Sequence, residues 1–172
     1  SMELTLIYNP TAGFDKPNKE ELIKLLTQNG NKVKFVDSNK DNLGDELEDP
    51  GDLVVVAGGD GTIAKVARRL IGKEVPLAIF SVGTANNIAV TFDACGAPEK
   101  QIVSWNLSKV RPFDVGIVSG SWGEGYFFES VGFGMLPILV KESKDKQKRE
   151  HLSFETRQEK IDFSLEILSE II

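Results

Sequence analysis

One aspartate lies inside a run of glycines where the chain could handle a phosphate group. Residues 58–62 read Gly-Gly-Asp-Gly-Thr. Glycines lack the Cβ atoms that would keep a phosphate from the backbone, and they permit positive φ angles, so consecutive N–H groups can face an anion. A carboxylate beside a phosphate is repelled unless it holds a cation or accepts a proton, and both are tasks in phosphoryl transfer. The loop therefore predicts phosphoryl-transfer chemistry with Asp60 at the reacting centre.

Two other apolar segments run into similar polar loops. Residues 4–8 lead into Asn-Pro-Thr-Ala-Gly at 9–13, and residues 77–82 lead into Gly-Thr-Ala-Asn-Asn at 83–87. Each pattern is typical of a strand that ends in a turn before a helix. Because the carboxyl ends of parallel strands meet at one edge of a sheet, we expect the three loops to lie together there.

The segments between the loops predict the sheet that positions them. Apolar spacing indicates helices over residues 17–29 and 62–71 and a short helical stretch ending at Phe92. A second strand is expected over residues 33–36, and the β-branched run at 53–57 is typical of a strand buried on both faces. This alternation predicts an α/β fold with a doubly wound, mostly parallel sheet.

The pattern changes near Val110. Apolar runs at 113–118 and 126–131, joined by a Gly/Ser-rich turn, predict an antiparallel hairpin. The mixed-charge run at 141–150 favours a solvated or disordered loop, and residues 161–171 predict a terminal helix. We expect a nucleotide-binding domain over residues 2–110 and, over 111–172, the incomplete start of a β domain plus that helix. Residues 111–139 are expected to pack on the first domain or on another copy of the chain.

Composition excludes several functions. The 172 residues carry a net charge of −6, which argues against nucleic-acid binding. One cysteine and one histidine exclude an internal disulfide framework and a His-rich metal cluster. No apolar run reaches the roughly 18 residues that cross a bilayer, so we expect a cytoplasmic protein.

Two other interpretations of the glycine loop remain open. The glycines could simply form a tight strand-to-helix turn, with Asp60 near a helix N-terminus. Gly59-x-Gly61-x-x-Ala64 also matches a dinucleotide-binding fingerprint, although it follows the third strand and would place the aspartate against a pyrophosphate. A Walker A loop, which closes on Gly-Lys-Ser/Thr, is absent.

The three loops, in this order and at these separations, resemble the diacylglycerol kinase catalytic domain family. That group includes bacterial lipid kinases and sphingosine kinases, and it is more distantly similar to NAD kinases and phosphofructokinases. The resemblance spans residues 4 to about 136. It implies an α/β nucleotide domain followed by a larger β-sandwich domain, with ATP, Mg²⁺ and a lipid hydroxyl meeting between them. A chain that stops at 172 residues would then be truncated, lack part of the acceptor site and be inactive by itself.

Matching motif positions assigns roles to particular residues. Asp60 is expected to act as general base, to orient the acceptor hydroxyl or to hold Mg²⁺ through water. Asp114 is expected to be structural or to support the residues that touch the substrate. The residues implied at the nucleotide are Asn9, Gly58, Gly59, Gly61, Thr62, Thr84 and Asn86, with Gly13, Asn87 and Glu142 as weaker candidates.

The sequence departs from the family motif at the third loop. There the family usually reads Gly-Thr-Gly-Asn-Asp-Phe-Ala, so Asn87 replaces an aspartate. The leading hypothesis is an ATP-dependent kinase of lipid metabolism that phosphorylates a diacylglycerol-like hydroxyl, with peripheral membrane contact and self-association left open. A nucleotide-binding regulator without catalysis is one alternative. An NAD kinase is another, although that family's Asn-Glu pair does not occur here.

Overall fold

The computed structural model describes residues 1–13, 17–28, 30–82, 86–130, 132 and 135–171. These residues form two compact units, Ser1–Glu129 and Ser130–Ile172. Each unit is described here by itself. The first contains all three predicted loops, although Thr84 lies outside the described residues.

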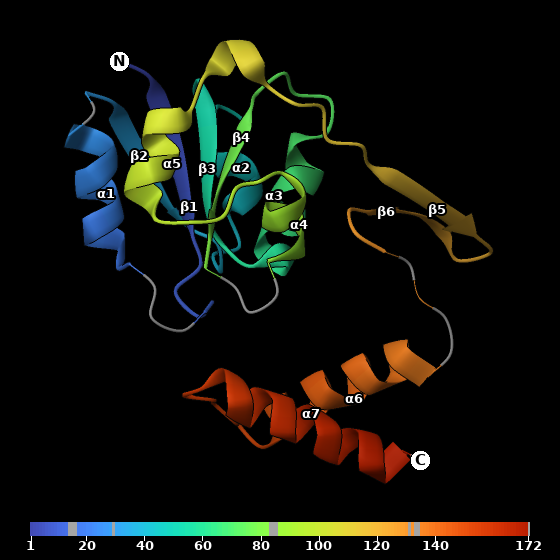
Figure 1. The fold of residues 1–172 in the computed structure, drawn as a ribbon. Coiled ribbons are helices and arrows are strands. Elements are labelled where there is room, and N and C mark those ends of the chain that lie inside the picture. Colours follow the sequence, from blue (N-terminus) through green and yellow to red (C-terminus); the bar gives the residue numbers. More distant parts are fainter. Residues whose placement is uncertain (14–16, 29, 83–85, 131, 133–134, 172) are drawn as a thin grey trace. The chain divides into compact units, whose positions relative to one another are not determined.

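Four parallel strands form the sheet of the first unit, and they confirm the predicted fold class (Figure 1). Their order is β2-β1-β3-β4. β1 pairs with β2 from Glu3↔Lys32 to Tyr8↔Asp37, and with β3 from Leu4↔Leu53. The strands are β1 (Glu3–Tyr8), β2 (Lys32–Asp37), β3 (Leu53–Gly58) and β4 (Leu77–Ser81).

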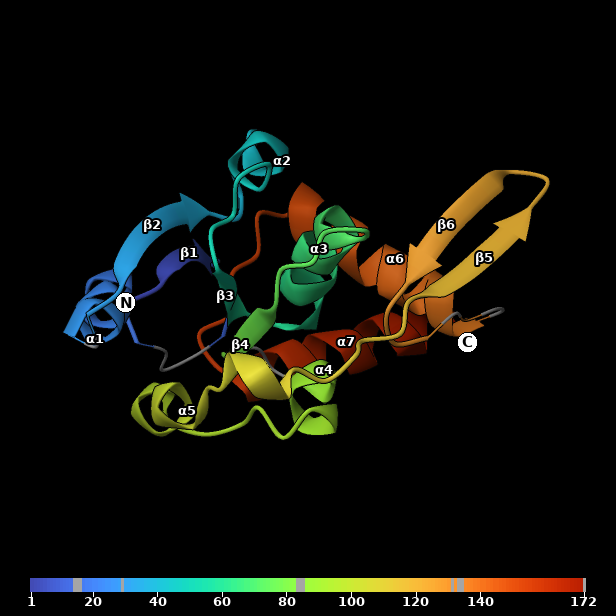
Figure 2. The same ribbon diagram turned by 90° about the horizontal axis from the view of Figure 1, so that it is seen from above.

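Helices cover both faces of this sheet, because alternate strand residues point to opposite sides. Leu6 and Val55 pack with α1 and α5 on one face, whereas Ile7 and Val54 pack with α2, α3 and α4 on the other. Figure 2 shows α1 and α5 on the side opposite α2 and α3. The helices are α1 (Lys19–Gln28), α2 (Leu43–Glu46), α3 (Asp60–Leu70), α4 (Asn87–Thr91) and α5 (Pro98–Ser104), followed by a 3₁₀ turn, η1 (Leu107–Lys109).

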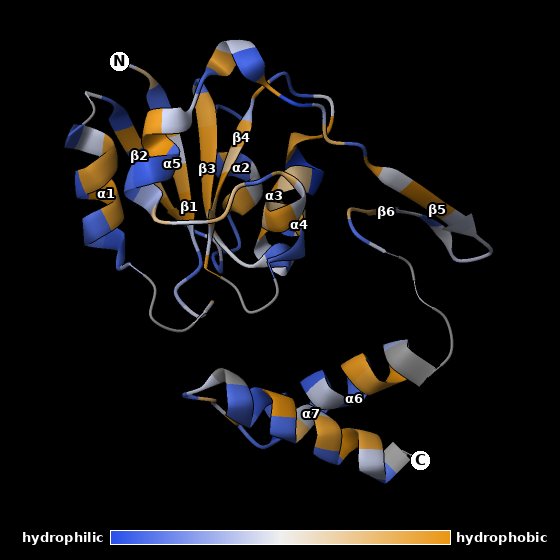
Figure 3. Ribbon diagram, in the orientation of Figure 1, coloured by the Kyte–Doolittle hydropathy of each residue, from blue (hydrophilic) through white to orange (hydrophobic). Residues whose placement is uncertain are grey.

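The central strand β3 is buried along its whole length, as its β-branched run predicted. Figure 3 shows it as an uninterrupted hydrophobic band. Because β3 reaches Gly58 and α3 already begins at Asp60, the turn between them is shorter than the sequence indicated. Asp60 therefore stands in the first turn of a helix rather than in a loop.

The predicted hairpin is present, with strands that lie closer to the turn and a tighter turn than expected. β5 (Gly116–Gly120) pairs antiparallel with β6 (Gly123–Phe127), so only Ser121 and Trp122 lie between them. Its base is fixed to the first unit: Arg68 on α3 donates to the Tyr126 carbonyl at 3.0 Å. Phe113 and Phe128 pack against the α3 side of the core. The compact unit therefore extends past residue 110 and includes the hairpin.

The second unit consists of α6 (Met135–Arg149) and α7 (Arg157–Ile171). The expectation of a solvated or disordered loop at 141–150 was wrong, because most of this run is the carboxyl-terminal half of α6. Lys146 explains the difference: it forms ion pairs with Glu166 at 3.2 Å and Glu170 at 2.8 Å on α7, which a charge pattern read locally does not reveal. The terminal helix is confirmed. No helix among the described residues has the length and apolar character needed to cross a bilayer.

Candidate functional site

The sheet order places a topological switch point between β1 and β3. The chain leaves β1 toward β2 on one side, and it leaves β3 toward β4 on the other. In open α/β sheets, ligands bind outside the carboxyl ends of the strands at such a switch point. The loops at 9–13 and 58–62 follow these two strands, so they flank the switch point.

A side-chain bridge joins these two loops. The Asn9 Nδ2 group donates to Thr62 Oγ1 at 2.8 Å. The Asn9 Oδ1 atom accepts from the Thr11 N–H at 3.0 Å and from the Thr11 hydroxyl at 2.9 Å. Thr62 is buried, with 7% of its surface exposed. The hydrogen bond between Asn9 and the buried Thr62 therefore holds the two loops together.

The backbone that follows β4 packs closely against the loop that follows β1. Gly13 has φ +73°, and a Cβ built there would lie 1.6 Å from the Val82 carbonyl oxygen. Only glycine allows this approach, because it has no Cβ and tolerates the left-handed region. The first loop therefore lies directly against the residue that follows β4.

The first turn of α3 presents open backbone amides in this region. The N–H groups of Thr62 and Ile63 both bond to the Gly59 carbonyl, at 2.9 and 3.0 Å. Among the described residues, nothing accepts from the N–H of Asp60 or Gly61. No described residue lies within 4 Å of a Cβ built at Gly61, so the described part of the chain leaves space beside this turn. Free amides and the positive end of the helix dipole make such a turn suited to an anion.

The Asp60 carboxylate reaches from α3 to the start of α4. Its Oδ2 atom accepts from the Asn87 N–H and its Oδ1 atom from the Ile88 N–H, both at 3.0 Å. Asn86, the residue before α4, has a left-handed backbone with φ 57° and makes no side-chain cap bond to the helix. The sequence did not indicate this contact, because the two partners lie 27 and 28 residues from Asp60.

The remaining predicted residues lie in different places. Asn87 is exposed at the first position of α4. Thr84 is outside the described residues, and Glu142 is an exposed residue of α6 in the second unit. Asp114 is exposed and, among the described residues, accepts no hydrogen bond, so nothing described here assigns it a structural contact.

Tyr8, the last residue of β1, has an altered acidity. Burial raises the pKa of its phenol above the usual 10.0, and the nearby carboxylates of Glu20 and Glu21 raise this pKa further. The phenol therefore stays neutral across the physiological range.

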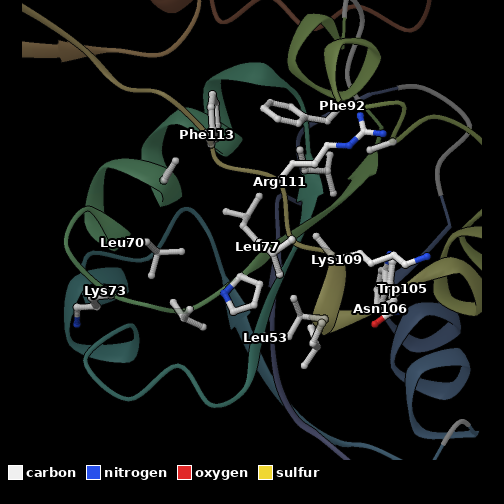
Figure 4. Close-up of a pocket in the computed structure, with 18 of the residues that line it drawn as sticks. Leu53, Leu70, Lys73, Leu77, Phe92, Trp105, Asn106, Lys109, Arg111 and Phe113 are labelled. Atoms are coloured by element: carbon white, nitrogen blue, oxygen red, sulfur yellow. The ribbon is translucent and has the colours of Figure 1, made fainter.

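A separate groove of about 650 Å³ borders β4 (Figure 4). The aromatic residues Phe92, Trp105 and Phe113 line it together with Lys109 and Arg111. None of the described residues of the three loops lines it. Sequence reasoning missed this groove, because its walls come from segments that are distant in the chain.

Comparisons with known proteins agree with this architecture. The model of the diacylglycerol kinase catalytic domain matches residues 3–118. A diacylglycerol kinase of Bacillus subtilis (strain 168) is 34% identical over 103 residues, which cover 56% of this chain and 32% of that protein. An uncharacterized protein of Synechocystis sp. (strain ATCC 27184 / PCC 6803 / Kazusa) is 31% identical over 127 residues, covering 61% of this chain and 29% of that protein. The chain spans about a third of the length of these relatives.

A solved structure supports the fold. A diacylglycerol kinase from Bacillus anthracis str. Sterne aligns with a TM-score of 0.51 at 23% identity, covering 66% of this chain and 46% of that one. The family match covers both the β1 loop and the glycine–aspartate turn of α3, which the structure brings together at the switch point. The chain therefore belongs to the diacylglycerol kinase catalytic domain family.

Proposed function

We propose that the protein transfers the γ-phosphoryl group of ATP to a lipid hydroxyl, with a diacylglycerol-like acceptor. The observation that carries this proposal is the open amide pair of Asp60 and Gly61, which lies beside a carboxylate at the switch point. Membership of a kinase-type family supports nucleotide use. The name of the Bacillus subtilis relative supports the acceptor class.

In this proposal the nucleotide phosphates lie against the first turn of α3. Gly61 supplies room and an open N–H group beside Gly59. Gly58 is buried at the end of β3, where the absence of a Cβ makes space for the Thr62 side chain, and the buried Thr62 sets the turn through its bond with Asn9. Gly13 acts by allowing the first loop to approach β4. We further propose that Thr84 and Asn86 border the nucleotide from the third loop, as their motif positions predict.

Mg²⁺ fits this site only with help from the substrate. Among the described residues, no group of three or more His, Cys, Asp or Glu side chains could hold a metal ion. Asp60 supplies one carboxylate, and each of its oxygens already accepts one N–H bond. Mg²⁺ usually takes one or two carboxylates plus substrate phosphates and water. The ion would therefore arrive with ATP, with Asp60 holding it directly or through water, and it would neutralise phosphate charge.

The proposal is tested first by binding and then by transfer. Calorimetry on the 172-residue chain should show ATP binding that needs Mg²⁺. The intact protein should then transfer labelled phosphate from ATP to a lipid in a panel of diacylglycerol, monoacylglycerol and sphingosine. Asp60→Asn should reduce this transfer, and Asp45→Asn, on an exposed residue of α2, should leave it unchanged. Wild-type transfer rates in Asp60→Asn, or NADP formed from NAD and ATP without any lipid product, would contradict the proposal.

One observation favours a second candidate, a nucleotide-binding protein without catalysis. Asn87 stands beside Asp60 and carries no charge where the family motif usually has an aspartate. Such a protein binds ATP in the calorimeter and phosphorylates nothing. Asn87→Asp in the intact protein distinguishes the two, because it should create lipid phosphorylation only if the missing carboxylate is what prevents it.

We also propose that the acceptor is met at a membrane surface. The hairpin carries exposed apolar side chains, with Trp122 70% and Ile117 60% exposed. These two exposed side chains also suit contact with another copy of the chain. Flotation with diacylglycerol-containing vesicles tests the membrane, and light scattering over a concentration series tests self-association.

A further inference from the structure

The carboxylate of Asp60, which is expected at a reacting centre, is hydrogen-bonded to backbone amides. Both of its oxygens accept backbone N–H bonds at the start of a different helix, at 3.0 Å each. We call this arrangement, Asp60 with the amides of Asn87 and Ile88, the Asp60 cap. A carboxylate beside phosphates is repelled unless its charge is compensated. Here the two amide N–H groups compensate part of the carboxylate charge.

α4 requires such a cap from elsewhere. The first amides of any helix lack partners within that helix, and a side chain at the preceding residue usually accepts from them. Asn86 occupies that position, but its backbone is left-handed, with φ 57°, and its side chain makes no cap bond. A capping residue normally has an extended backbone, so Asn86 cannot serve in this conformation. Asp60 accepts from the amides that Asn86 leaves open.

The Asp60 cap also links the two halves of the site. Asp60 is the first residue of α3, and its own N–H is one of the two open amides of that turn. Ile88 and Ala89 are buried with Ile63 in one core cluster. Movement of the α4 start would therefore pull on the side chain of the same residue whose backbone faces the proposed phosphate.

We propose that Asp60 is the positioning residue of this site. Its carboxylate sets the start of α4 against the first turn of α3, so that nucleotide binding at that turn depends on the position of the Asn87 and Ile88 amides. The inference rests on the proposed function, because it assigns the nucleotide to that turn. Asp60 then acts through the two loops, and each carboxylate oxygen retains a further lone pair for a cation or a hydroxyl.

Hydrogen exchange and nucleotide affinity test this role together. Asp60→Ala should raise the exchange rates of the Asn87 and Ile88 amides about tenfold and weaken Mg·ATP binding about tenfold, as expected for loss of a hydrogen bond to a charged group. Asp60→Asn keeps one acceptor oxygen, so it should restore protection of one amide and part of the affinity. Asp45→Asn removes an exposed first-turn carboxylate of α2 that caps no other helix, and it should change neither.

Each outcome decides something. Unchanged exchange at both amides in Asp60→Ala overturns the inference, as does faster exchange with wild-type ATP affinity. A residue acting only as base predicts normal exchange and affinity with loss of turnover in both variants. If the wild-type chain binds no ATP, the proposed function fails. Faster exchange in Asp60→Ala but not in Asp45→Asn would then still support Asp60 as the residue that sets α4.

Discussion

Replacing Gly13 by alanine tests whether close packing assembles the site. A Cβ at this position would lie 1.6 Å from the Val82 carbonyl oxygen, so the two loops must separate by roughly 1.4 Å before the atom clears 3.0 Å. The left-handed backbone adds strain of about 1 kcal/mol, and overpacking adds about 1–3 kcal/mol. We therefore expect Gly13→Ala to lower the free energy of unfolding by about 2–4 kcal/mol.

Gly30→Ala is the matched control. Gly30 has nearly the same backbone angle, with φ +77°, but nothing lies within 4 Å of a Cβ built there. Gly30→Ala should therefore lower the free energy of unfolding only by the backbone strain, which is about 1 kcal/mol. Urea unfolding of both variants measures the difference, and calorimetry measures ATP affinity, which only Gly13→Ala should weaken. Equal stability losses in the two variants would refute the close approach of the first loop to β4.

Two further predictions concern the same edge of the sheet. Thr62→Val removes the acceptor of the 2.8 Å hydrogen bond from Asn9. The free energy of unfolding, measured in urea, should fall by about 1–2 kcal/mol, and ATP should bind more weakly. Wild-type values for both would contradict the bridge. The raised pKa of Tyr8, caused by burial and then by Glu20 and Glu21, means that the folded state holds the phenolic proton more tightly than the unfolded state. The contribution of the protonated Tyr8 phenol to stability is complete below pH 10 and is lost as the pH rises through the folded-state pKa. Urea titrations at pH 9 to 11 should show this loss of stability in the wild type and a smaller loss in Tyr8→Phe.

The order of the elements and the chemistry of the loops could be predicted from the sequence. The run at 53–57 is almost all β-branched or small and apolar, and a strand with both faces buried needs that composition. The glycines at 58–61 identified a backbone that a phosphate could approach, because this property belongs to the residue type. Family membership followed from the same local motifs.

Which partners the motif residues meet was decided only by the tertiary structure. Asp60 is predicted from the sequence as a group for the reacting centre, yet its carboxylate accepts from amides 27 and 28 residues away. The mixed-charge run at 141–150 favours a loop when read locally, but it is largely helical, with Lys146 paired across to α7. Periodicity and propensity report on neighbours in the chain. A hydrogen bond or an ion pair between distant residues depends on how the helices and strands pack, and so does the groove beside β4.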